Sequence, residues 1–186
     1  MSREVFMAAI DEERESISIG GGEPTLHPLF WEFLMTAVAK VSSVWLATNG
    51  SNTEISLVLA DLARKGIIGC ALSQDMWHDP IDARVVQAFT KERTDRYVVD
   101  DVATRSIRNV EANVVGVGRA LENELMSGIG NRCVCASMIV RPDGDVMYCG
   151  CPDAPCLGNI LTSYDPHDPE VCCIKEREPE LVGESE

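Results

Sequence analysis

The chain lacks long hydrophobic runs, an excess of positive charge and any cysteine before Cys70. No apolar run is long enough to cross a bilayer, and Met1 to Glu15 is charged without the apolar core of a signal peptide. We therefore expect a cytoplasmic protein with no membrane partner. A formal net charge of −14 also disfavours non-specific binding to nucleic acid. There is neither a Gly-x4-Gly-Lys-Ser/Thr phosphate loop nor a recognisable Ser/His/Asp arrangement.

The eight cysteines are distributed very unevenly. Cys70 stands alone, and the other seven all lie between Cys133 and Cys173. In a cytoplasmic protein such cysteines are not expected to form disulfides. They are better explained as metal ligands or free thiols.

Strand and helix patterns alternate along the first two thirds of the chain. Strands are expected over residues 16–20, 41–48, 67–73, 96–99 and 113–117. One helix is expected over residues 4–14, and a second begins at Pro28. A third follows a capping box formed by Ser51 and Glu54 and ends at Gly66. A fourth begins at the N-cap pair Asp79-Pro80. This order indicates an α/β fold of parallel βα units. About four or five units are too few for a closed eight-stranded barrel, so we predict an open sheet or partial barrel.

Three regions are expected along the chain. Residues 1–125 form the α/β core, residues 126–163 a cysteine-rich extension, and residues 164–186 an acidic, disordered tail. A hairpin is predicted within the extension, because Pro142-Asp143-Gly144 separates two apolar runs between Met138 and Tyr148. Within the core, Cys70, Trp31 and Trp45 are expected to be buried side chains.

The first candidate site is the group of cysteines that surround this hairpin: Cys133, Cys135, Cys149, Cys151 and Cys156. Four converging thiolates suit either tetrahedral zinc or an iron–sulfur cluster. Both metals prefer sulfur, so the residue types leave both open. The alternative is a set of buried structural cysteines or free thiols.

The second candidate site is the stretch Gly20 to Pro28, where a predicted strand enters a glycine turn that carries Glu23. Glycines allow turn geometries and a close approach of the backbone to a ligand. The carboxyl ends of parallel strands are where α/β sheets and barrels bind ligands. The alternative is a tight strand–helix turn with Glu23 in the first turn of the helix.

Five segments in order resemble the radical S-adenosylmethionine superfamily, over roughly residues 16 to 160. Gly20 to Pro28 resembles its Gly-Gly-Glu-Pro motif, and Leu46 to Gly50 its strand ending in Thr-Asn-Gly. Ala71 to Asp75 and Val115 to Ala120 resemble two later strands. The auxiliary-cluster extension of the family, called the SPASM or twitch domain, is resembled by the pattern of Cys133, Gly144 and Cys149, followed by residues 157–160.

The resemblance implies roles for particular residues. S-adenosylmethionine would be bound by Gly21, Gly22, Glu23, Pro24, Thr48, Asn49, Ser73, Gly116 and Gly118. Glu23 and the two glycines would hold the methionyl amine, and the last two glycines would approach the adenine. The hairpin cysteines would ligate an auxiliary 4Fe-4S cluster, with zinc as the alternative. The implied reaction is hydrogen abstraction from a peptide, protein or small-molecule substrate.

One family element is missing from this sequence. The catalytic 4Fe-4S cluster of the family is bound by C-x3-C-x2-C after the first strand, and no cysteine precedes Glu23. We expect the chain to be a fragment, to have a start assigned too late, or to be a degenerate relative lacking the first strand. This chain alone is therefore expected not to cleave S-adenosylmethionine. The alternative function is a non-catalytic metal-binding module that serves a partner protein.

Overall fold

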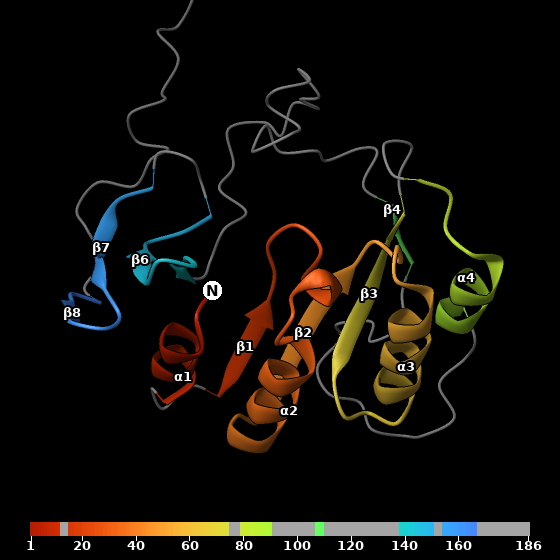
Figure 1. Ribbon diagram of the computed structural model, residues 1–186, viewed down its shortest axis with the longest axis horizontal. Coiled ribbons are helices and arrows are strands. Elements are labelled where there is room, and N and C mark those ends of the chain that lie inside the picture. The colour runs from red at the N-terminus through yellow and green to blue at the C-terminus, as the bar shows by residue number, and fades with distance from the viewer. Residues whose placement is uncertain (12–14, 75–78, 91–106, 110–137, 151–153, 167–186) are drawn as a thin grey trace, which may run out of the picture. The chain divides into compact units, whose positions relative to one another are not determined.

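The computed structural model describes residues 1–11, 15–74, 79–90, 107–109, 138–150 and 154–166. Residues 10–112 form one compact unit, and residues 1–9 with 113–186 form another. Figure 1 gives the helix and strand labels. Within the described residues, no helix combines the length and the apolar character needed to span a membrane.

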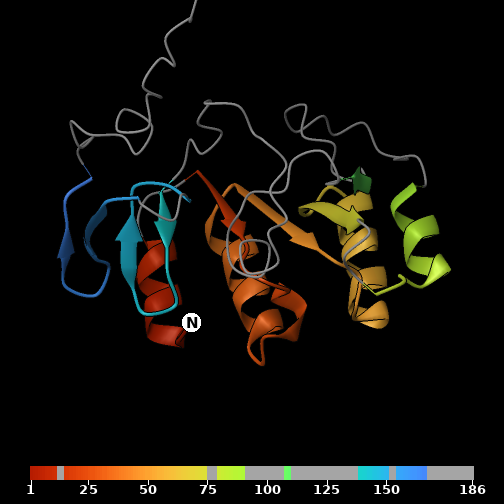
Figure 2. The same ribbon diagram turned by 90° about the horizontal axis from the view of Figure 1, so that it is seen from above.

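The first unit contains a parallel sheet in which strands that are consecutive in sequence are also neighbours in space. Its order is β1-β2-β3-β4, and all three pairings are parallel. The strands are β1 (Ser16–Ile19), β2 (Ser43–Thr48), β3 (Gly69–Gln74) and β4 (Ile107–Asn109). The helical elements of this unit are η1 (Pro24–Leu26), α2 (Phe30–Lys40), α3 (Thr53–Arg64) and α4 (Ala83–Thr90). Figures 1 and 2 show α2, α3 and α4 on the same face of the sheet.

The core of this unit lies between the sheet and these helices. Every second residue of β2 is buried, which is the pattern of a strand with one covered face. The fully buried side chains include Leu46 and Thr48 on β2, Cys70 and Leu72 on β3, Leu34 on α2, Leu59 on α3 and Phe89 on α4. The prediction that Cys70 is a core residue is confirmed. The prediction for Trp31 is wrong, because its position on α2 leaves it 38% exposed.

The prediction of an α/β fold with a parallel sheet is confirmed. The four described strands do not close into a barrel. The predicted strands at 96–99 and 113–117 lie outside the described residues. Of the tail predicted over 164–186, residues 164–166 are described, and Tyr164 ends the last strand, while the rest lies outside the described residues. Strand β4 was not expected. It is only three residues long, which is too short for an alternating apolar pattern to be recognised in the sequence. It is defined as a strand by its parallel pairing with β3.

Three predicted helix starts are shifted. Pro24 rather than Pro28 lies at the first helical position, where it opens η1, and α2 begins only at Phe30. The first turn of α3 is capped by Asn52 instead of Ser51, because the Asn52 side chain accepts a hydrogen bond of 3.2 Å from Ile55 N.

The third shifted start is that of α4. Asp79 and Pro80 lie ahead of the helix, and Asp82 Oδ1 accepts a hydrogen bond of 2.8 Å from Arg84 N in its first turn. The predicted end of α3 is confirmed, since Gly66 follows the helix with a φ of +73°.

The second unit holds an antiparallel sheet in the order β5-β6-β7-β8. Its strands are β5 (Ile139–Val140), β6 (Asp145–Met147), β7 (Cys156–Asn159) and β8 (Ser163–Tyr164). The predicted hairpin is confirmed, with Ile139 opposite Met147 and Gly144 in the turn at a φ of +96°. Strands β7 and β8 were not predicted. The N-terminal helix α1 (Arg3–Asp11) agrees with the helix expected over 4–14.

Candidate functional site

The turn after β1 directs a carboxylate towards the end of β2. Gly21 and Gly22 have φ values of +94° and +50°, which side chains other than glycine adopt only with strain. The next residue, Glu23, returns to an extended conformation and caps η1. The glycine turn thus reverses the chain and presents the Glu23 side chain at the carboxyl ends of the strands.

The Glu23 carboxylate is held by four hydrogen bonds from three residues. Its Oε1 accepts from Thr25 N at 3.1 Å, from Thr25 Oγ1 at 2.7 Å and from Thr48 Oγ1 at 2.9 Å. Its Oε2 accepts from Asn49 N at 2.5 Å. Hydrogen bonds to a carboxylate are among the stronger ones in proteins. Glu23 is therefore fixed between η1 and the end of β2.

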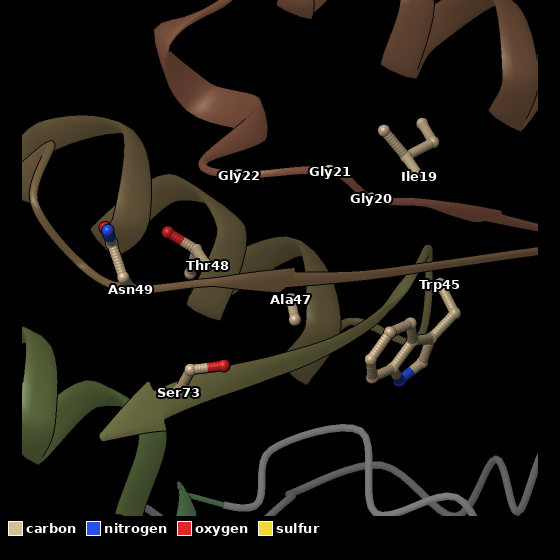
Figure 3. Close-up of a pocket in the computed structure, with 9 residues that line it drawn as sticks. All are labelled: Ile19, Gly20, Gly21, Gly22, Trp45, Ala47, Thr48, Asn49 and Ser73. Carbon is tan, nitrogen blue, oxygen red and sulfur yellow. The ribbon is translucent and has the colours of Figure 1, made fainter. Parts of the chain in front are cut away.

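A pocket with a volume of about 270 Å³ lies at the carboxyl ends of β1, β2 and β3. It is lined by Ile19, Gly20, Gly21, Gly22, Trp45, Ala47, Thr48, Asn49 and Ser73 (Figure 3). Open parallel sheets bind ligands at this end of their strands. The pocket is slightly smaller than the roughly 300–1,000 Å³ of typical small-molecule sites.

The sheet surface beside the pocket is built from small residues. Those that alternate with the buried Leu46 and Leu72 are Ala47 on β2 and Ala71 and Ser73 on β3. Their side chains are small, and Ala71 among them is buried. Trp45 belongs to the same alternating set and is half-buried at the pocket. The expectation that Trp45 is an ordinary core residue is therefore wrong.

Most residues expected to bind the cofactor lie together in the structure. Gly21, Gly22, Thr48, Asn49 and Ser73 line the one pocket. Glu23 is joined to it through its bonds to Thr48 and Asn49, and Pro24 is buried at the start of η1. Gly116 and Gly118 lie outside the described residues.

Sequence reasoning missed Thr25, Trp45 and Ala47. Thr25 contributes two of the four bonds to Glu23, and its position two residues after a capping carboxylate was the available signal. Trp45 and Ala47 alternate with the buried residues of the strand expected over 41–48. That alternation could have placed both side chains on the face away from the helices.

Cys70 lies on β3 opposite Leu46, with no exposed surface. Burial, together with a smaller effect of the Glu23 charge, raises the pKa of its thiol to about 12. A thiol with such a pKa is protonated at neutral pH. Cys70 is therefore a buried, protonated thiol of low reactivity in the core of the sheet.

The described part of the cysteine segment comprises Cys149, which is buried after β6, and Cys156, which is exposed at the start of β7. Both are free thiols, and Cys156 Sγ donates to Gly158 O at 3.5 Å. Cys133, Cys135 and Cys151 lie outside the described residues. Within the described residues, no three His, Cys, Asp or Glu side chains are grouped to hold a metal.

Comparison with known proteins adds no relative from which a family could be assigned. No family model, no curated protein and no solved structure matches the chain.

Proposed function

We propose that this chain binds S-adenosylmethionine in the pocket at the ends of β1, β2 and β3, as a member of the radical S-adenosylmethionine superfamily. The observation that carries the proposal is the Glu23 clamp, which consists of the Glu23 carboxylate and its hydrogen-bond donors Thr25, Thr48 and Asn49. It joins the Gly-Gly-Glu-Pro loop to the Thr-Asn-Gly segment through hydrogen bonds of 2.9 Å and 2.5 Å. Two motifs that resemble the same family therefore meet at one pocket.

The strand order supports a partial (β/α) barrel as the fold behind this pocket. In doubly wound sheets the strand order reverses and helices cover both faces. Here the order is sequential, and α2, α3 and α4 share one face (Figure 2). In this proposal, the small residues on the other face would form the inner surface of the barrel wall. The proposal includes a strand that precedes β1 in an intact relative.

Glu23 suits the methionyl end of the ligand. A carboxylate has about four acceptor positions. Among the described residues, Oε2 accepts a hydrogen bond only from Asn49 N. That oxygen retains capacity for the ammonium group of an amino acid, which would form a charge-assisted pair. Gly21 and Gly22 are exposed, and no described atom lies within 4 Å of the position that a Cβ would take at either residue.

In intact members of the superfamily, S-adenosylmethionine supplies a radical that abstracts hydrogen from a substrate after reductive cleavage at a 4Fe-4S cluster. The cysteines that would bind such a cluster are missing ahead of Glu23. The role proposed for this chain is therefore binding and orientation of the cofactor. The proposed substrate is a peptide, a protein or a small molecule, by analogy with the family alone.

The cysteine segment is proposed to bind an auxiliary 4Fe-4S cluster, with zinc as the alternative. The β6–β7 ladder pairs Cys156 with Met147, and Cys149 follows Met147 by two residues, so the two cysteines lie at the same end of this pairing. Cys133, Cys135 and Cys151 would complete the thiolate set. Anaerobic purification followed by iron, sulfide and zinc analysis tests this part. Iron and sulfide in equal amounts support a cluster, and zinc without iron would overturn it.

The alternative function is a non-catalytic metal-binding module. The absence of cysteine before Cys70 favours it over an enzyme for this chain by itself. This alternative keeps the metal but needs no S-adenosylmethionine. Binding of that cofactor therefore separates the two functions.

Isothermal titration calorimetry with S-adenosylmethionine tests the proposal. We expect Glu23→Gln to bind it at least about tenfold more weakly than the unaltered chain, because an amide loses the charge that pairs with the ammonium. Glu54→Gln is the matched control, since Glu54 is an exposed residue in the first turn of α3. Methylthioadenosine, which lacks the amino-acid end, should bind the unaltered chain and Glu23→Gln alike. Equal affinity of both chains for S-adenosylmethionine would overturn the proposal.

A further inference from the structure

Trp45 and Gly69 form a matched pair across β2 and β3. They are direct partners in the parallel register. A Cβ atom at position 69 would lie 2.7 Å from Trp45 Cδ1, which is closer than side chains pack, and 3.5 Å from Trp45 Cγ. The indole thus occupies the space over Gly69, and glycine at that position permits it.

The indole lies on the pocket side of the sheet. Trp45 belongs to the set of β2 residues that alternates with the buried Val44, Leu46 and Thr48. Figure 3 shows its ring beside Ala47, with Ser73 on the adjoining strand. It is the one aromatic side chain among the described residues that line the pocket. A large, flat and half-buried ring therefore lines the pocket, and its nearest described neighbours on the two strands are small.

Trp45 is well separated from the Glu23 clamp. The clamp contacts Thr48 and Asn49, three and four residues further along β2. At about 3.3 Å per residue, this places roughly 10 Å between the two ends of the pocket. One end is polar and anionic, and the other is aromatic. A ligand that fits both ends carries a hydrogen-bond donor or cation at one end and a flat ring at the other.

We propose that the Trp45 indole is a stacking platform for a flat aromatic ring of the ligand. The inference rests on the proposed function in so far as that function makes this pocket a ligand site. The ring has two chemical sources, the purine of a nucleoside such as the adenosyl group, or an aromatic side chain of a peptide substrate. Both stack on an indole face in the same way.

Adenosine and N-acetyl-L-tyrosinamide are the probes that separate these sources. Each is titrated by calorimetry into the 186-residue chain, Trp45→Leu and the control Trp31→Leu, whose side chain is exposed on α2. We expect at least one probe to bind the unaltered chain and Trp31→Leu alike, and to bind Trp45→Leu about tenfold or more weakly. If only adenosine binds Trp45→Leu more weakly, the ring that stacks on Trp45 is a purine. If only N-acetyl-L-tyrosinamide does so, it is an aromatic side chain of a peptide. Equal affinity for Trp45→Leu, or no binding of either probe to the unaltered chain, overturns the platform.

Two further variants guard against a simple loss of folding. Trp45→Phe keeps an aromatic face and should retain an affinity between those of the unaltered chain and Trp45→Leu. Gly69→Ala keeps the indole but pushes it from its place, so it should weaken binding while circular dichroism shows an intact fold. A folded Gly69→Ala protein with unchanged affinity would contradict the proposal. Neither probe carries the amino-acid part of methionine, so their binding tests Trp45 and does not depend on an ammonium group paired with Glu23. The proposal for Trp45 can therefore be overturned while the proposal for Glu23 stands, and the proposal for Glu23 can be overturned while that for Trp45 stands.

Discussion

Thr48 Oγ1 donates a hydrogen bond of 2.9 Å to Glu23 Oε1, and this contact fastens the loop after β1 to the end of β2. The same hydroxyl accepts a hydrogen bond of 3.1 Å from Gly50 N in the turn that follows. Thr48 is almost completely buried. One side chain therefore connects the Gly-Gly-Glu-Pro loop, the strand end and the Asn49-Gly50 turn.

Replacing Thr48 with valine should destabilise the protein by about 1–3 kcal/mol. Valine keeps the branched shape but leaves the buried Gly50 N–H without its acceptor and removes one donor from Glu23. Urea unfolding followed by circular dichroism measures the change. Thr36→Val is the control, because the Thr36 hydroxyl donates to Glu32 O on an exposed face of α2 and its loss should cost under about 0.5 kcal/mol. A Thr48→Val midpoint equal to that of Thr36→Val would contradict the role given to this hydroxyl.

Gly50→Ala should be destabilising by about 2 kcal/mol or more. Gly50 has a φ of +76°, and a Cβ there would lie 2.8 Å from Ile81 Cγ2 and 3.0 Å from Leu72 Cδ1. Alanine would meet both backbone strain and overpacking. Gly20→Ala is the matched control, because no atom lies within 4 Å of its Cβ position and its φ is not positive. Thermal unfolding of both variants compares them, and equal losses of stability would show that the turn is not constrained as described.

The sequence predicted which residues belong to the site better than it predicted which of them are in contact. The sequence predicts a turn that carries a carboxylate at Gly21, Gly22 and Glu23. The apolar run before Asn49 predicts a strand. The bond between Thr48 and Glu23 joins positions 25 apart in the sequence. Such a contact depends on the parallel register of β1 and β2, which local patterns do not specify.

The sequence errors arose where neighbouring residues carry equivalent local signals. Ser51 and Asn52 are both good helix caps, and the side chain that reaches Ile55 N decides between them. A different error concerns Trp45, which was expected in the core and lies half-buried at the pocket. Its actual place depends on Gly69, a distant residue whose lack of a side chain leaves room for the ring.

Cys70 should resist alkylation in the folded protein. Its pKa of about 12 exceeds the ordinary value of 9.0, chiefly because of burial, so the reactive thiolate is scarce below pH 9. We expect iodoacetamide at pH 8 to modify the exposed Cys156 but not Cys70 until urea unfolds the chain. Peptide mass spectrometry of both cysteines measures this, with Cys156 as the internal control. Modification of both at the same rate in the native protein would contradict the burial of Cys70.

The same shift sets the direction of a pH effect on stability. The folded state holds the Cys70 proton more tightly than the unfolded state, so the unfolded chain binds fewer protons above pH 9. The contribution of Cys70 to stability is therefore present below pH 9 and is lost as the pH rises towards 12. Cys70→Ala should unfold with a weaker dependence on pH between 9 and 11 than the unaltered chain. An identical pH dependence in urea unfolding would show that the thiol does not titrate as described.

The 186-residue chain should produce no 5′-deoxyadenosine when supplied with S-adenosylmethionine, iron, sulfide and dithionite. Reductive cleavage requires an iron with an open position beside the bound cofactor. This chain has no cysteine between Met1 and Glu23 to hold such a cluster, and Cys70 is a buried, protonated thiol. Binding through Glu23 should persist, so calorimetry and product analysis by mass spectrometry should give opposite answers on one sample. An intact superfamily enzyme assayed in parallel shows that the reagents are competent. Formation of 5′-deoxyadenosine above the level given by Glu23→Gln would mean that cysteines after Cys133 supply the catalytic iron, and the role of binding alone would be wrong.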